Sequence, residues 1–331
     1  MDKNNESSVM YIAKAFALYS IVMAHSAYTS IDSAIVQNIF ERVSTIGVFI
    51  FLVISGYYYT KDGINHKYCF REFWKRKLFT LMIPWLINAS AFYGLEVITH
   101  LGEQKFEVGT YLNFIFGNGS LFYYMTILCL CYILCWNMVK SEKILWACVI
   151  VNIISLIVTS ENISASGVNP YLNIFNWIGI FAIGILTKKY QMIEYFINLS
   201  KRKSILIAAC CASMAIILMQ IDYGYAYFTK TSLAIECLLA VCVFEFGKYC
   251  PKKLVGYLEY IGSITLPIYF WHIVVLNFVL DSEMARKSIM AAIVRPALTI
   301  GIMSAVIYCM QIAAKRLGVN KILGIVSGVR I

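Results

Sequence analysis

The chain has 331 residues, 60% hydrophobic and 14% charged, with a mean hydropathy of +0.72. This balance excludes an ordinary soluble domain and predicts an all-α integral membrane protein. A net charge of +10 would suit nucleic-acid binding, but the positions of the basic residues along the chain favour a different origin for it.

Apolar runs near twenty residues long predict a bundle of about ten transmembrane helices. They cover 9–28, 43–59, 78–98, 120–138, 144–159, 171–187, 204–220, 230–247, 262–280 and 290–312. With both termini in the cytoplasm, most of the 28 Lys and Arg residues lie on the inner side, which is the positive-inside pattern. The basic residues left on the outer side are Arg42, Lys105, Lys230, Arg286, Lys287 and Arg295. We therefore expect residues 1–331 to form one multi-pass domain in the plasma (inner) membrane, with no nucleic-acid partner.

The first expected span, Val9 to Tyr28, contains Lys14 and His25. An ionisable side chain in hydrocarbon is costly and usually faces a protein-lined cavity. Eleven helical residues make about three turns, so both side chains are expected on one face, roughly 16 Å apart. A neutral imidazole at this place can take a proton from a hydroxyl group. The alternatives are a packing histidine bonded to another span and a lysine that extends to the headgroups.

Two features follow near the cytoplasmic end. Ser55 and Gly56 lie near the inner end of the second apolar run. Small residues there allow close helix approach or leave room for a ligand near Lys14. The segment Phe70–Lys77 has an apolar and a basic face and is predicted to lie along the membrane surface. Lys77 is on its apolar face, so a cation there could hold an anionic cofactor, although headgroup anchoring explains the rest of the segment.

Later spans add distorting prolines and a second intramembrane histidine. Pro84 and Pro267 are expected to distort their helices, which is tolerated where spans line a cavity. His272 is placed near mid-membrane and indicates either a polar interior or a structural hydrogen bond. Glu236, the deepest acid, could orient a histidine, pair with a base or stay protonated. Tyr123 and Tyr124 are expected in the aromatic belt, and no metal-ligand spacing is present.

In this order the segments resemble the integral-membrane acyltransferase-3 family, which includes bacterial O-acetyltransferases of surface polysaccharides. The resemblance is carried by Lys14 with His25, by the run Phe51–Tyr57, by Phe73–Lys77 followed by Pro84, and by Ser263, Tyr269 and His272. The chain departs from the family pattern at three places. Lys14 replaces the usual arginine and so lacks its bidentate fork; Phe79 and Thr80 stand where a further cation is common; and Leu121 replaces a frequent tryptophan.

The resemblance implies a cytosolic acyl-CoA donor, acetyl-CoA in the first place, and a glycan or lipid-linked saccharide acceptor, with the bilayer as a further partner. It implies catalytic roles for His25 and His272 and donor binding by Lys14, Ser55, Arg76 and Lys77, without a metal. The alternative class is a transporter or flippase in which intramembrane histidines relay protons, although no inverted repeat is evident. The acyl group, the acceptor, a direct or covalent transfer route and the oligomeric state are left open.

Overall fold

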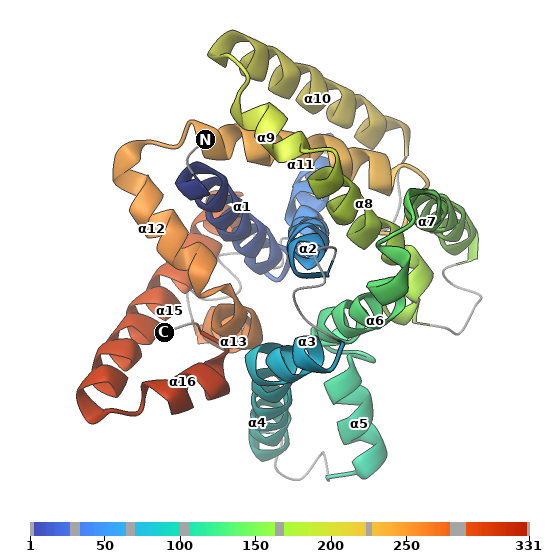
Figure 1. Cartoon of the computed structure of the whole chain (residues 1–331). Coiled ribbons are helices and arrows are strands. Elements are labelled where there is room, and N and C mark those ends of the chain that lie inside the picture. The colour runs from blue at the N-terminus through green and yellow to red at the C-terminus, as the bar shows by residue number, and fades with distance from the viewer. Residues whose placement is uncertain are drawn as a thin grey trace.

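The computed structural model describes residues 3–26, 34–63, 70–99, 106–162, 169–222, 227–278 and 289–329. These segments are almost entirely helical and include no strand, as the composition predicts. Figure 1 shows α1 (Lys3–Ala24) and α2 (Ala34–Gly63) at the centre of the bundle, surrounded by the later helices. Of the most apolar stretches of α1 and α2, 61% and 67% are buried, against 17% for α10 (Lys201–Ile221), which lies at the periphery.

The described part of the chain has six helices long and apolar enough to cross a membrane. They are α1, α2, the continuous helix Phe70–Thr99, α7 (Glu142–Asn162), α10 and α15 (Ile289–Leu317). A seventh is obtained if α12 (Lys252–Ser263) and α13 (Thr265–Phe278), bent by 84°, are counted as one span. The chain is thus a multi-pass membrane protein. The expected number of ten is not reached by this criterion, because three of the expected spans are helices of fewer than 18 residues. These are α6 (Tyr123–Met138), α8 (Ile178–Lys189) and α11 (Ser232–Lys248).

Short elements connect these helices. They are α3 (Phe70–Lys77), a π-helical turn (Leu78–Met82), α4 (Ile83–Thr99), α5 (Val108–Phe116), the 3₁₀ turns η2 (Pro170–Leu172) and η3 (Ile174–Asn176), α9 (Met192–Ile197) and α16 (Asn320–Ser327). The π-helical turn accommodates Pro84, which has no N–H and would clash within a regular helix. The Ile83 N–H donates to the Leu78 carbonyl, five residues back, so α3 continues into α4. Pro267 lies in the first turn of α13, where a missing N–H costs least, and the bend precedes it.

Glycines allow the central helices to touch. A Cβ atom on Gly47 of α2 would lie 2.2 Å from the Ala17 carbonyl oxygen of α1, and one on Gly56 would lie 2.2 Å from the Phe181 carbonyl oxygen of α8. The Ser20 hydroxyl donates to the Ser44 carbonyl at 2.8 Å and accepts from the Gly47 N–H at 3.0 Å. The Ser55–Gly56 pair therefore serves close helix packing through its glycine.

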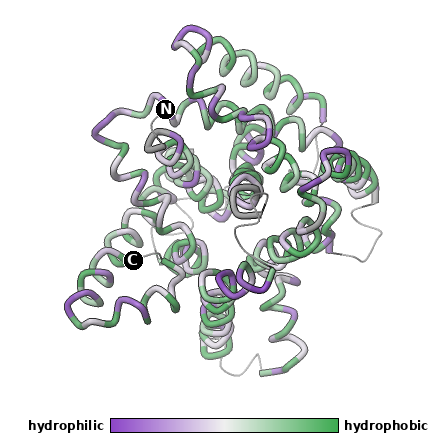
Figure 2. The backbone as a smooth tube through the Cα atoms, viewed as in Figure 1, coloured by the Kyte–Doolittle hydropathy of each residue, from purple (hydrophilic) through white to green (hydrophobic). Residues whose placement is uncertain are grey.

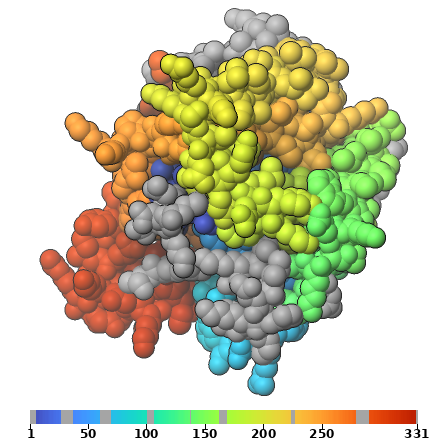
Figure 3. Space-filling view, turned by 45° about the horizontal axis from the view of Figure 1, so that its top comes forward, coloured from blue at the N-terminus to red at the C-terminus, as the bar shows by residue number. Residues whose placement is uncertain are grey.

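The surface of the bundle is apolar where it would meet lipid. Figure 2 shows green, hydrophobic stretches along the peripheral helices. Large apolar side chains of α7, α10 and α15 are exposed, among them Ile154, Leu206 and Val306. In the space-filling view of Figure 3 only small patches of α1 are visible, because yellow and orange segments of the chain lie over it. Helix α1 finishes at one end of the bundle, which we call the His25 end. Helix α3 begins at the opposite end, which we call the Lys77 end.

Candidate active site

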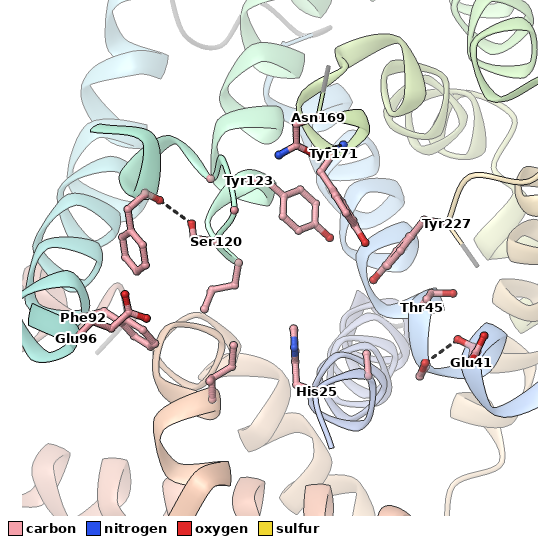
Figure 4. A pocket seen from close by; sticks show the side chains of 17 residues that line it. His25, Glu41, Thr45, Phe92, Glu96, Ser120, Tyr123, Asn169, Tyr171 and Tyr227 are labelled. Atoms are coloured by element: carbon pink, nitrogen blue, oxygen red, sulfur yellow. Dashed lines mark hydrogen bonds between the residues drawn. The ribbon is translucent and has the colours of Figure 1, made fainter. Parts of the chain in front are cut away.

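An open cavity of about 900 Å³ lies at the His25 end. Its wall comes from the end of α1, the first turns of α2, α4 with α5 and the turn after it, α13, and the segments around Tyr171 and Tyr227. Figure 4 shows the side chains of these regions around one space, with His25 pointing into it. A concavity with several aromatic rings and a few polar groups is the usual form of a ligand site. We call it the His25 cavity.

The structure corrects the expected position of His25. The first helix ends at Ala24, and His25 and Ser26 form the turn that follows. The Ser26 N–H donates to the Met23 carbonyl at 3.0 Å, and the Ser26 hydroxyl donates to the Val22 carbonyl at 3.1 Å, which closes the helix end. Because His25 lies beyond the helix, its spacing from Lys14 does not set the direction of its side chain. The side chain is instead exposed to the cavity.

His272 lies beside His25, although the two are far apart in sequence. Their ring centroids are 5.1 Å apart and their planes are inclined by 48°. His272 Nδ1 lies 2.7 Å from the Tyr269 carbonyl oxygen, one turn earlier on α13. A carbonyl oxygen only accepts, so Nδ1 carries the proton and Nε2 keeps its lone pair. Within the described residues Nε2 is buried without a hydrogen-bond partner, so the pair combines an open imidazole with a buried acceptor.

A buried cation joins the two segments that carry these histidines. Arg295 of α15 is 4% exposed. Its Nη1 donates to the Ser26 carbonyl at 3.2 Å and its Nη2 to the Leu276 carbonyl of α13 at 2.7 Å. The sequence placed Arg295 among the outer cations and gave it no role. Its position inside an expected span, 290–312, is the signal that could have identified it.

Three tyrosines form one wall of the His25 cavity. Tyr123 and Tyr171 have ring centroids 4.7 Å apart, and Tyr171 and Tyr227 have centroids 5.7 Å apart. The side chain of Asn169 accepts from the Tyr171 N–H at 3.0 Å, which shapes the turn that presents this ring. Tyr123, expected in an aromatic belt, thus lines the cavity. The sequence did not single out Tyr171 or Tyr227, because only the fold brings η2 and the segment before α11 to this end.

The turn after α5 forms another part of the wall. Residues 99–119 lie between two of the expected spans, and within them 108–116 form α5. Gly117 ends this helix with φ +86°, a conformation that favours glycine, and a Cβ there would lie 2.0 Å from the Tyr123 backbone nitrogen. The Ser120 hydroxyl donates to the Phe114 carbonyl at 2.6 Å, and both residues line the cavity.

The charged residues among the described lining of the cavity are Glu41 and Glu96. Arg42, the neighbour of Glu41, is buried and donates to the Asp222 carbonyl at 3.0 Å. Glu236 is buried and interacts electrostatically with Arg42. Glu236 thus lies within electrostatic reach of an arginine that the sequence placed on the outer side, and its role stays a prediction.

The residues expected to bind a donor lie away from this cavity, and none of the four belongs to its described lining. The Lys14 ammonium lies over the rings of Tyr11 and Tyr58, 5.1 and 5.4 Å from their centroids. The Ser55 side chain lies near that of Tyr124 of α6.

At the Lys77 end the side chain of Lys77 turns towards the bundle. Its ammonium donates to the Tyr132 hydroxyl at 3.1 Å and lies over the Tyr132 ring. Arg76 is half-buried. A groove of about 780 Å³ follows α3 and the π-helical turn, and its lining includes Arg71 and Lys75. Both cations belong to the basic face of the segment Phe70–Lys77, which the sequence predicts to lie along the membrane surface.

A chain of neighbouring side chains leads from the two histidines into the bundle as far as Ser55. The Tyr269 ring lies 6.0 Å from that of His272 and 5.7 Å from that of Tyr124, measured between centroids. Tyr124 in turn lies near Ser55. The fold thus brings His25 and His272 together and places Ser55 one step further along the bundle, with Lys14 and Lys77 beyond the cavity wall.

One of the comparisons with known proteins gives a match. A family model described as an acyltransferase domain matches residues 10–314, which include the cavity, both histidines and α3. No curated protein and no solved structure matches the chain.

Proposed function

We propose, from the premise that this chain belongs to the acyltransferase-3 family, that it is an O-acyltransferase of the plasma membrane. It moves an acyl group, acetyl in the first place, from cytosolic acyl-CoA to a hydroxyl group of a cell-surface or lipid-linked glycan. The single observation that carries this proposal is the pair of neighbouring imidazoles beside an open cavity, one exposed to it and one buried.

In the proposed reaction His25 is the general base. The acceptor oxygen attacks the thioester carbonyl carbon, and its proton passes to the imidazole of His25 as the carbon–oxygen bond forms. The carbon–sulfur bond then breaks, and the thiolate takes the proton from the imidazolium, so the products are the ester and free CoA. When substrate is bound, His272 Nε2 is proposed to accept a hydrogen bond from the second ring nitrogen of His25, which would hold that ring in the tautomer with its free lone pair towards the cavity. In the structure itself Nε2 has no hydrogen-bond partner within the described residues.

The acceptor is proposed to enter from the His25 end. The faces of Tyr171 and Tyr227 suit the apolar face of a sugar ring, and Glu41 and Glu96 can accept hydrogen bonds from its hydroxyl groups. A saccharide bound there brings a hydroxyl group next to His25, which is the arrangement that general-base catalysis needs.

The donor is proposed to bind from the opposite, cytosolic side. Lys14, Arg76 and Lys77 would balance the negative charges of the CoA phosphates. The pantetheine arm would then follow Ser55 and Tyr124 towards His272, displacing the tyrosine rings as it enters. This division puts donor and acceptor on opposite faces of the membrane, with His25 where they meet.

The test compares surface glycans from cells that lack the protein, cells that carry it, and cells that carry the His25→Ala variant. We expect wild-type protein to add the mass of one or more acyl groups, and the purified variant to lose about 10²- to 10⁴-fold in rate while unfolding at the same temperature. Full activity of the variant would contradict the assignment of His25. Unchanged glycan masses with reduced glycan export would instead support the transporter class.

Donor binding is tested separately by heating the purified protein with and without acetyl-CoA. A ligand that binds the folded state raises the apparent unfolding temperature. We expect such a shift with acetyl-CoA, and a smaller one in a Lys77→Ala variant. Equal shifts in both proteins would remove Lys77 from the donor site.

A further inference from the structure

Arg295 is a cation buried in the apolar interior of the bundle, in a helix long enough to span the membrane. A charged side chain in this position is costly, so the presence of one indicates a specific role. Its two hydrogen bonds described above go to the backbone carbonyls of Ser26 and Leu276. The location of these two carbonyls indicates the role of Arg295.

Both carbonyls lie close to one of the two histidines in the chain. Ser26 directly follows His25 in the turn after α1, and Leu276 lies in the last turn of α13, one turn beyond His272. Carbonyl groups near the end of a helix carry partial negative charge, so a cation binds them favourably. Arg295 thus caps the two segments that hold the two histidines.

The shape of the guanidinium group also fixes the distance between the two carbonyls that it binds. Its two terminal nitrogens lie in one rigid plane, so two carbonyls bound to it are held at a fixed separation. The turn at His25 and the end of α13 therefore keep one relative position, and with it the 5.1 Å between the imidazole centroids. A lysine has one ammonium group on a flexible stem and cannot impose the same spacing.

We infer that Arg295 is a positioning residue of the proposed acyl transfer, which sets the placement of His25 against His272 by bridging the Ser26 and Leu276 carbonyls. The inference rests on the proposed function and adds to it a residue that does not touch substrate. It also explains why a basic residue lies at the end of the bundle where the positive-inside rule disfavours one.

The test uses three variants of the full-length protein: Arg295→Ala, Arg295→Lys and Tyr19→Phe. Tyr19 is the matched control, because its hydroxyl donates to the Ile293 carbonyl at 2.8 Å and so also joins α1 to α15, without touching the histidine turn. We measure kcat, KM for the acyl-CoA and the unfolding temperature of each. For both Arg295 variants we expect kcat per folded molecule to fall about 10²-fold, as for a reacting group misplaced by about 1 Å, with KM for the donor nearly unchanged. Tyr19→Phe should keep the wild-type kcat.

Chemical rescue distinguishes positioning from a general loss of stability. Millimolar guanidinium chloride should restore part of the kcat of Arg295→Ala, and the same concentration of sodium chloride should not. Arg295→Lys decides the question if Arg295→Ala does not fold. Wild-type kcat per folded molecule in the lysine variant, or in a folded alanine variant, would overturn the inference. If His25→Ala is inactive while these variants are fully active, only the role of Arg295 is lost; if His25→Ala is fully active, the proposed function itself fails.

Discussion

At the scale of single residues, the two histidines differ in their surroundings. His25 is open to the cavity, whereas His272 is fully buried and is held by a hydrogen bond within its own helix. The sequence treated them as similar intramembrane histidines. Their difference suggests a division of work in which the exposed ring meets the substrate and the buried ring orients it.

This division predicts the effect of replacing His272. His272→Leu should reduce kcat about 10²-fold, as a displaced base does. It should lower the free energy of unfolding by only about 1 kcal/mol, because it removes one hydrogen bond, from Nδ1 to the Tyr269 carbonyl, and Nε2 has no partner to lose within the described residues. His272→Gln, which keeps an acceptor atom, should retain more activity. Steady-state kinetics and thermal unfolding of both variants provide the measurement; equal rates for leucine, glutamine and wild type would contradict the orienting role.

At the scale of elements, close helix contacts explain why α1 and α2 form the centre. The glycine at position 47 lets the backbone of α2 approach that of α1, and the Ser20 hydroxyl links the same two helices. Such small-residue contacts are the main way in which membrane helices gain packing energy, since lipid removes most of the hydrophobic drive between them. The position of the His25 turn depends on this contact.

Two glycines give a matched test of this packing. Gly47→Ala should lower the free energy of unfolding by about 1–3 kcal/mol, because its Cβ would overlap the Ala17 carbonyl. Gly94→Ala, in α4, has nothing within 4 Å of the new Cβ, so it should be neutral or stabilising by up to about 1 kcal/mol through helix propensity. Thermal unfolding in detergent measures both. Similar effects of the two substitutions would show that the contact at Gly47 is not tight.

At the scale of the whole molecule, contacts between distant parts of the chain close the Lys77 end. The Lys188 ammonium lies 2.6 Å from a carboxylate oxygen of Glu194 and 3.4 Å from one of Glu6. The Tyr57 hydroxyl donates to Glu6 at 2.6 Å. One half-buried cluster thus ties α1, α2, α8 and α9 together, opposite the His25 cavity.

The cluster predicts how stability depends on pH. Partial burial raises the pKa of Glu194, but the hydrogen bond and charge of Lys188, a backbone hydrogen bond and the Tyr57 hydroxyl together outweigh it and leave the pKa below its usual value. The stabilisation by the charged carboxylate is therefore present above the usual carboxyl pKa and is lost as the pH falls through the lowered folded value. Glu194→Gln should unfold at a temperature that varies less across this acid range than wild type, whereas Glu259→Gln, outside the cluster, should follow wild type. Parallel curves for all three proteins would contradict this account.

The sequence alone determined the all-helical membrane architecture, because apolar run length and the alternation of basic loops are local properties of the chain. It also placed His25, His272 and the segment before Pro84 as the features of interest, and the family match over residues 10–314 bears out the resemblance drawn from them. The tertiary structure decided what depends on packing between distant segments. The end of α1 at Ala24, the meeting of His25 with His272, the tyrosine wall and the bridge from Arg295 all arise where helices converge. Hydropathy and periodicity describe one segment at a time and carry no information about which segments meet.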